Sequence, residues 1–214
     1  MSNSLSRRSF ASLTAGLVLG AAAHQAAAED TPKSGPPQPL VPAGPREAVF
    51  ARDYPAPGFK PSWKKPQLNR VQVQDFVIYA HSDLNMVKQL LEKEPALINA
   101  TMDWGAGDWE TGLGGASHMG RRDIVSFLLD KGARIDLFCA AMLGMLDVVK
   151  AFLTLQPKLI DARGPHGFTL HFHAQVGGKE AEPVLDYLQS IKKVELKPIP
   201  FMRKPADTAP KKPS

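Results

Sequence analysis

Histidines are the residues of this 214-residue chain whose spacing offers the most chemistry. His166, His171 and His173 crowd one short stretch, while His81 and His118 stand earlier in the chain. Neutral imidazole is a common ligand of zinc and other transition metals. Because a single residue separates His171 from His173, the two side chains could supply two ligands to one ion.

A metal-binding or enzymatic site of this kind needs further ligands. The candidate set consists of three histidines and one acid: His118, His171 and His173, with Asp108 or Glu110. It requires these side chains to converge on one cavity. No glutamate or cysteine close to the His171-x-His173 pair completes a recognisable ligand pattern. We therefore adopt the alternative, in which these histidines are structural, and expect no metal and no cofactor.

Other signatures of catalysis are missing from the sequence. It contains no Ser-His-Asp arrangement, no nucleophile elbow and no phosphate-binding glycine loop. The single cysteine, Cys139, excludes an internal disulfide and any multi-cysteine metal site. No flanking charge suggests a reactive thiol, so we expect Cys139 to be buried and inert. We predict no catalytic residue and no enzymatic activity.

An acidic segment that contains two tryptophans is the second candidate site. Residues 103–110 read Asp-Trp-Gly-Ala-Gly-Asp-Trp-Glu, in which the glycines permit a tight excursion. Tryptophan beside charged residues is typical of binding hot spots. The candidate partner-binding residues are therefore Asp103, Trp104, Asp108, Trp109 and Glu110. In the alternative, both tryptophans fold back to cover the first repeat and Asp108 caps a helix, since tryptophan usually buries most of its surface.

Apolar doublets recur at the same offsets along the middle of the chain. They follow Ser82, Gly120 and Gly144, and they are Met86-Val87 with Leu90-Leu91, Ile124-Val125 with Leu128-Leu129, and Val148-Val149 with Phe152-Leu153. Doublets one turn apart lie on one face of a helix. A fourth copy follows Gly178, with Pro183 suited to a first helical turn.

A shorter helix rich in small residues is expected before each of the later doublet helices. Its markers are Ala116, Ala140-Ala141 and Ala174. Small side chains let neighbouring helices approach closely. The stacked helices would then shield one another's apolar faces, which no helix pair can do alone.

This order of helix, turn, helix, Gly-Ala and polar finger resembles the ankyrin repeat. The resemblance is carried by residues 120–133, by 140–149, and by the repeat opening His-Gly-Phe-Thr-Leu-His-Phe-His-Ala at 166–174, which 111–116 match in reduced form. It covers about residues 75–190. It implies an all-α ankyrin-repeat solenoid of about four helix-turn-helix repeats that binds a protein partner. In that family the histidine of the repeat opening is structural.

The chain departs from a regular repeat in three ways. The first finger is long, because Ser82 and Gly120 are 38 residues apart, and the proline and histidine of the repeat opening are absent from copies two and three. The third departure is a shortened spacing. Gly120 and Gly144 are 24 residues apart, whereas Gly144 and Gly178 are 34 apart. The whole finger is therefore missing between the second and third copies. We expect a concave surface that is not a regular groove.

The two ends of the chain differ from the repeats. Residues 1–28 contain Arg7-Arg8, an apolar stretch of small residues and an Ala-x-Ala site, and so resemble a twin-arginine export signal. An ordinary secretory signal or an uncleaved anchor is the alternative. We expect a disordered Pro-rich lead at 29–70, repeats at 71–191, and a disordered, basic and Pro-rich tail at 192–214.

The distribution of charge and the expected export both argue against nucleic acid as a partner. Residues 29–191 carry 17 basic and 19 acidic side chains, so the basic character of the chain comes from its ends. No nucleic-acid module is recognisable, and export argues against one. We expect a monomeric, periplasmic or secreted, non-catalytic protein–protein interaction module that meets the membrane only during export. A metal-binding or enzymatic site lined by histidines of the repeats is the alternative.

Overall fold

The computed structural model describes residues 47–199 and residue 201, all of which belong to one unit, residues 43–214. The predicted all-α class is confirmed in its coarse form, because these residues are mostly helical and contain only two short strands. The predicted export signal, the first part of the Pro-rich lead and most of the tail lie outside the described residues. Within the described residues, no helix is both long and apolar enough to span a membrane.

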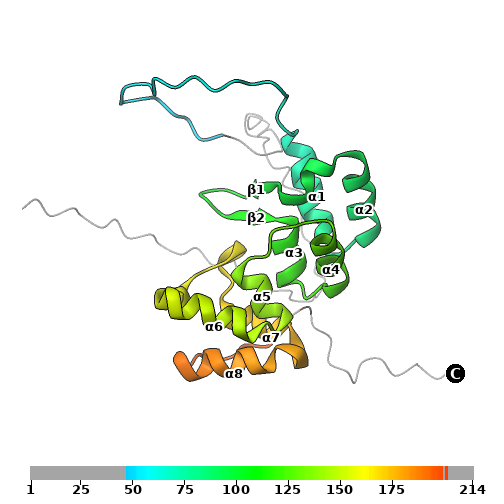
Figure 1. Ribbon diagram of the computed structural model, residues 1–214, viewed down its shortest axis with the longest axis vertical. Coiled ribbons are helices and arrows are strands. Elements are labelled where there is room, and N and C mark those ends of the chain that lie inside the picture. Colours follow the sequence, from blue (N-terminus) through cyan, green and yellow to red (C-terminus); the bar gives the residue numbers. More distant parts are fainter. Residues whose placement is uncertain (1–46, 200, 202–214) are drawn as a thin grey trace, which may run out of the picture. The chain divides into compact units, whose positions relative to one another are not determined.

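The helices form four consecutive pairs (Figure 1). The pairs are α1 (Arg70–Ala80) with α2 (Leu84–Lys93), α3 (Gly112–His118) with α4 (Arg122–Asp130), α5 (Leu137–Leu143) with α6 (Leu146–Leu155), and α7 (Leu170–Val176) with α8 (Glu182–Ile191). The first helix of each pair packs against the first helix of the next. Helices α1, α3, α5 and α7 therefore form one continuous layer.

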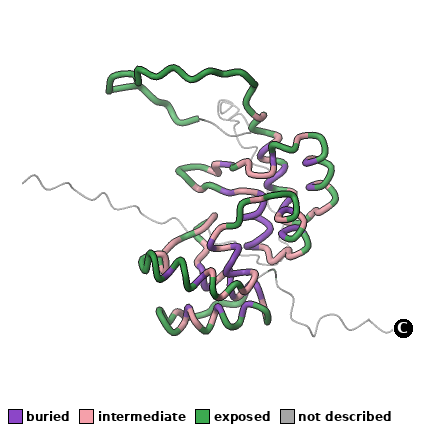
Figure 2. The backbone as a smooth tube through the Cα atoms, in the orientation of Figure 1, coloured by how far each residue is buried: buried purple, intermediate pink, exposed green. Residues whose placement is uncertain are grey.

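The repeated apolar positions supply the core, as the doublets predict. Val87, Val125, Leu128, Val149 and Leu188 are buried, whereas most of their doublet partners are only partly covered. Figure 2 shows buried segments along the facing sides of the paired helices. Each large aliphatic side chain removed from water contributes about 1.5–3 kcal/mol, so this packing dominates the stability of the stack.

Small residues line the contacts between the first helices. Ala116, Ala140, Ala141 and Ala174 are completely buried there. Their short side chains permit the close approach of α3, α5 and α7. Pro183 lies in the first turn of α8, where its missing N–H is not needed.

The connections between pairs differ in length, and this difference positions the site. Residues 94–111 form the 3₁₀ helix η1 (Pro95–Asn99) and a hairpin of β1 (Thr101–Asp103) and β2 (Trp109–Thr111). Residues 156–169 form the 3₁₀ turns η2 (Pro157–Asp161) and η3 (Pro165–Gly167). Between α4 and α5 only residues 131–136 intervene. Because no finger projects there, the η3 turn contacts the β1–β2 hairpin directly.

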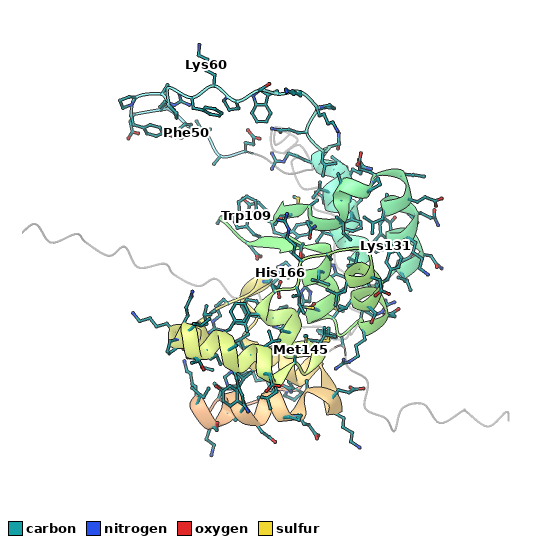
Figure 3. The ribbon with its side chains drawn as sticks, viewed as in Figure 1. Phe50, Lys60, Trp109, Lys131, Met145 and His166 are labelled. Atoms are coloured by element: carbon teal, nitrogen blue, oxygen red, sulfur yellow. The ribbon has the colours of Figure 1, made fainter. Side chains whose placement is uncertain are left out.

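The segment before the helices is extended, whereas the segment after them packs against α7. Residues 47–69 contain no helix or strand, and Phe50 and Lys60 lie on this extended segment (Figure 3). Residues 192–199 do not match the disordered tail expected from residue 192 onward, because they fold back onto α7. Gln175 Nε2 donates to the Lys197 carbonyl at 2.8 Å, and Ile199 is buried. The buried Ile199 side chain and the hydrogen bond from the Gln175 side chain hold the segment in place.

Candidate metal site

Glu110 is a charged residue that the β1–β2 hairpin places in the interior. It pairs with Met102 across the antiparallel strands, and the two side chains occupy the same inward face. Only 1% of Glu110 is exposed, compared with 60% of Trp109, its neighbour on β2. The alternation of a β-strand therefore sends the carboxylate inward and leaves the Trp109 indole in solvent.

A tight turn closes the hairpin and fixes the two strands. Residues Gly105, Ala106 and Gly107 all have positive φ. The Asp103 Oδ1 atom accepts hydrogen bonds from the Gly105 and Gly107 N–H groups, at 2.9 and 3.3 Å. Asp103 is thus engaged in the turn itself.

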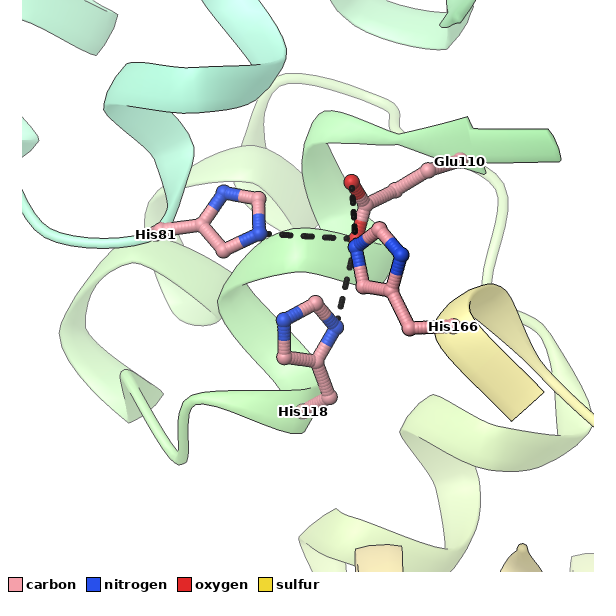
Figure 4. A group of neighbouring side chains, drawn as sticks. All are labelled: His81, Glu110, His118 and His166. Carbon is pink, nitrogen blue, oxygen red and sulfur yellow. Dashed lines mark ion pairs between the residues drawn. The ribbon is translucent and has the colours of Figure 1, made fainter. Parts of the chain in front are cut away.

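Three histidines from separate parts of the stack approach the Glu110 carboxylate (Figure 4). His81 directly follows α1, His118 is the last residue of α3, and His166 lies in η3. Glu110 Oε1 is 3.5 Å from His81 Nε2 and 3.2 Å from His118 Nδ1. Glu110 Oε2 is 3.4 Å from His166 Nε2. One ligand atom from each residue can be chosen so that no two lie more than 4.8 Å apart.

The four side chains form a site with a buried floor and a more open rim. The Glu110 and His118 side chains are 0% and 4% exposed, whereas those of His81 and His166 are 23% and 35% exposed. Space for the His81 ring exists because residue 115 in α3 is glycine. A Cβ atom at Gly115 would lie 2.8 Å from the His81 ring.

Hydrogen bonds on the far side of two rings determine which nitrogen faces the carboxylate. His81 Nδ1 lies 2.8 Å from the Val77 carbonyl, and His166 Nδ1 lies 2.9 Å from Asp108 Oδ2. Both partners are acceptors, so each Nδ1 carries a proton and donates it. In the neutral rings the Nε2 lone pairs then point toward Glu110. Metal-bound histidines are usually held in this way by a carbonyl or carboxylate on their other nitrogen.

The floor of the site contains polar atoms without partners. Glu110 Oε1 and His118 Nδ1 are both buried, and neither makes a hydrogen bond. At 3.2 Å they are close, but their orientation is not that of a hydrogen bond. The other carboxylate oxygen, Oε2, accepts a hydrogen bond from Trp104 Nε1 at 2.7 Å. Unpaired polar atoms this deeply buried are uncommon in proteins and require an explanation.

The Glu110 carboxyl remains ionised in this environment. Burial raises its pKa, but the contact with the His118 side chain and the electrostatic attraction of the His81 and His118 rings outweigh burial. The hydrogen bond from Trp104 lowers the pKa further, which therefore lies below the usual value for glutamate. A buried anion facing imidazole lone pairs is stabilised when a cation lies between them.

The ligand types and spacings suit a small transition-metal ion. Ligand atoms about 2.0–2.1 Å from a tetrahedral Zn²⁺ ion lie about 3.3–3.4 Å from one another. Glu110 Oε1 lies 3.2 Å from His118 Nδ1 and 3.5 Å from His81 Nε2, whereas His166 Nε2 is 3.4 Å from the other oxygen, Oε2. With one ligand atom from each residue the largest separation is 4.8 Å, so the more exposed rings must move inward to complete a tetrahedron. Imidazole nitrogen is a borderline ligand that suits zinc, copper and nickel, and zinc also accepts the harder carboxylate oxygen.

The structure corrects the histidine set predicted from the sequence. His118 belongs to the cluster, but His171 and His173 do not converge on it. His171 Nε2 contacts the Lys192 carbonyl at 2.9 Å, and His173 Nδ1 contacts the Thr169 carbonyl at 2.9 Å. These two side chains point elsewhere because α7 directs them toward its own first turn and toward the segment after α8.

The five predicted partner-binding residues are separated by the fold. Asp103 closes the turn, Trp104 folds back and donates to the carboxylate, and only Trp109 has an indole that is mostly exposed. Asp108 does not cap a helix; it accepts two hydrogen bonds from His166. Glu110 is buried and so cannot offer its carboxylate to a partner.

His81 and His166 were not among the ligands predicted from the sequence. His81 and His118 stand at equivalent places near the ends of α1 and α3, which was a usable signal. The missing finger between α4 and α5 was the signal for His166, because it leaves the hairpin and η3 facing each other. No protein-family model matches the chain, and a search of curated proteins finds no match either.

Proposed function

We propose that this protein binds one divalent transition-metal ion, with Zn²⁺ as the ion that the ligands suit best. The ligands are His81, Glu110, His118 and His166. The observation that carries the proposal is the buried contact between Glu110 Oε1 and His118 Nδ1, two polar atoms 3.2 Å apart that make no hydrogen bond. An ion between them satisfies both atoms and compensates the buried charge.

Protonation of the histidines satisfies this cluster less well than a metal ion does. One proton bridges two atoms, whereas three nitrogens face Glu110 at 3.2–3.5 Å. Protonating all three imidazoles would place three like charges around one site, because His81 and His118 have ring centroids only 4.8 Å apart. A single dication serves all four side chains without that repulsion.

We further propose that the scaffold is an ankyrin-type solenoid of about four repeats that is exported through a twin-arginine-type signal. The four stacked helix pairs and the buried alanines between their first helices support this assignment. The Arg7-Arg8 pair and the apolar stretch after it support export. The metal site is then held by the stack, with the ion bound outside the cytoplasm.

Calorimetric titration with Zn²⁺ tests the metal site directly. Residues 29–214, freed of metal with a chelator, are expected to bind one equivalent of Zn²⁺. Glu110→Gln keeps the size of the side chain but replaces the anionic ligand with a neutral amide oxygen, so the affinity for Zn²⁺ should fall by about a hundredfold. His171→Gln is the matched control, because His171 lies outside the cluster and should leave affinity unchanged. Absence of binding by the unmodified protein, or equal binding by Glu110→Gln, contradicts the proposal.

Binding of a protein partner is a second candidate function, favoured by one observation. The Trp109 indole is 60% exposed and borders a cavity of about 520 Å³ next to α1 and β1. Exposed tryptophans at such sites are frequent interface anchors. Affinity capture from periplasm with the unmodified protein and with Trp109→Ala tests this candidate. An identical set of captured proteins would remove Trp109 as an interaction residue.

A further inference from the structure

The four ligands of the proposed site come from parts of the stack that are not neighbours. His81 follows the first helix of the first pair and His118 ends the first helix of the second pair, whereas His166 precedes the fourth pair. Stability in stacked repeats arises mostly from contacts between adjacent repeats. The second and fourth pairs already meet behind α5, where α3 contacts α7 and Arg122 donates to the Gly177 carbonyl at 2.8 Å. A bond from the hairpin to η3 adds a second connection, on the side of the stack where the loops lie.

The short connection between α4 and α5 makes this second connection possible. Residues 131–136 form no finger, so the η3 turn lies against the β1–β2 hairpin across the start of α5. The contact is made by Asp108 and His166, which are 58 residues apart. Both the site and its reach across the stack follow from the missing finger.

His166 differs from the other three ligands in strain and in exposure. Its φ of 57° lies in the left-handed region, which non-glycine residues adopt only when surrounding contacts hold them there. Its side chain is 35% exposed, whereas Glu110 and His118 are buried. His81, Glu110 and His118 thus lie in the first two pairs and the hairpin that connects them, whereas His166 lies in the surface turn η3.

We infer, on the basis of the proposed metal site, that the ion acts as a clamp that fastens η3 to the hairpin and joins the two halves of the stack. His81, Glu110 and His118 form the permanent part of the site. His166 is the latch: a bond from its Nε2 to the ion adds to the two hydrogen bonds that it makes with Asp108, and η3 is held less firmly when the ion leaves. Ion occupancy thereby regulates how cooperatively the first two and the last two helix pairs unfold.

Hydrogen exchange measured by mass spectrometry on the full chain tests the clamp. Adding Zn²⁺ to the metal-free protein should slow exchange by about tenfold or more in residues 163–169 and in α7 and α8. Helix α2 contributes no ligand and serves as the internal reference, with a smaller change expected. His166→Ala should still bind Zn²⁺, more weakly, but Zn²⁺ should no longer protect residues 163–169.

The possible outcomes separate the clamp from the metal site on which it rests. If the unmodified protein binds Zn²⁺ by calorimetry and exchange in residues 163–169 does not change, the clamp is wrong and the metal site stands. If Zn²⁺ protects that loop equally in His166→Ala, His166 is not the latch. If His166→Ala, shown to be folded by circular dichroism, loses all binding, then the other three ligands do not form a permanent part and the inference fails. No binding by the unmodified protein removes both proposals.

Discussion

The Asp108 carboxylate holds His166 at two points. Its Oδ1 atom accepts a hydrogen bond from the backbone N–H of His166 at 2.8 Å, and its Oδ2 atom accepts one from the ring Nδ1 at 2.9 Å. This pair fixes the backbone of η3 and the rotation of the imidazole at the same time. The remaining ring nitrogen, Nε2, is left facing Glu110.

Replacing Asp108 should weaken metal binding without removing a ligand. Asp108→Asn loses the charged acceptor on His166 Nδ1, and loss of such an outer partner typically lowers metal affinity about 10–100-fold. Asp103→Asn is the matched control, because it changes the same charge on the same hairpin while the amide oxygen still accepts from Gly105. Calorimetry with Zn²⁺ measures both variants. An equal loss in both would mean that Asp108 acts only through its long-range charge.

Two adjacent glycines in α3, Gly114 and Gly115, allow the position of the His81 ring to be tested separately from the stability of the helix. A Cβ atom at Gly115 would lie 2.8 Å from the His81 ring, whereas one at Gly114 would meet Pro165 at an ordinary 3.5 Å. Both alanine substitutions favour the helix by roughly 0.5–1 kcal/mol. Only Gly115→Ala should displace His81, and we expect about tenfold weaker Zn²⁺ binding from such a disturbed ligand. Equal affinity of Gly114→Ala and Gly115→Ala would contradict the role of Gly115.

His173 should make the protein less stable in mild acid. Burial lowers its pKa from 6.5 to about 4, against the hydrogen bond to the Thr169 carbonyl, which raises it. Below pH 6.5 the unfolded chain takes up a proton that the folded chain does not. Stability is therefore full above pH 6.5 and declines until about pH 4, where the folded form also takes up the proton.

The control for this pH dependence is His173→Phe, which removes the titrating group among the rings of Phe138, Phe168 and Phe172. Urea unfolding of the metal-free protein across this pH range measures the free energy of unfolding. The variant should show a shallower decline with falling pH. The same slope in both proteins would show that His173 does not cause it.

The doublet helices should be sensitive to truncation at their buried positions only. Leu128 is fully buried in α4, so Leu128→Ala should lower the free energy of unfolding by about 2–5 kcal/mol, and Leu128→Asp should prevent folding. Leu155 at the end of α6 is 81% exposed. Leu155→Ala should therefore change the free energy of unfolding by less than about 0.5 kcal/mol. Thermal or urea unfolding followed by circular dichroism measures both. A normal melting profile for Leu128→Asp would contradict the observed packing.

Local pattern was sufficient to predict much of the helical structure. The doublet at Val148-Val149 and the alanines at 140 and 141 lie where their spacing indicated, because a helix repeats its environment every three to four residues. The predicted burial of Cys139 is confirmed, and burial raises the pKa of its thiol to about 12. The predicted absence of a finger between the second and third copies is confirmed by the short connection from α4 to α5.

The hairpin was harder to predict from the sequence. Residues 103–110 were expected to form a loop in which Trp104 and Trp109 are either both exposed for binding or both folded back. Strand alternation instead separates them, so that Trp104 reaches the carboxylate while Trp109 stays in solvent. Short strands of three residues carry too little periodic signal to indicate which side chains face inward.

The sequence alone determined that this chain has helices with one apolar face, an irregular finger pattern, and histidines and acids in the connections. Only the tertiary structure decided which of these residues meet. Glu110 and His166 lie far apart along the chain, and their contact depends on the stacking of four helix pairs and on the omission of one finger. A ligand set assembled from separate repeats leaves no local spacing to recognise, because the distances are set by packing between helices rather than by the period of any one of them.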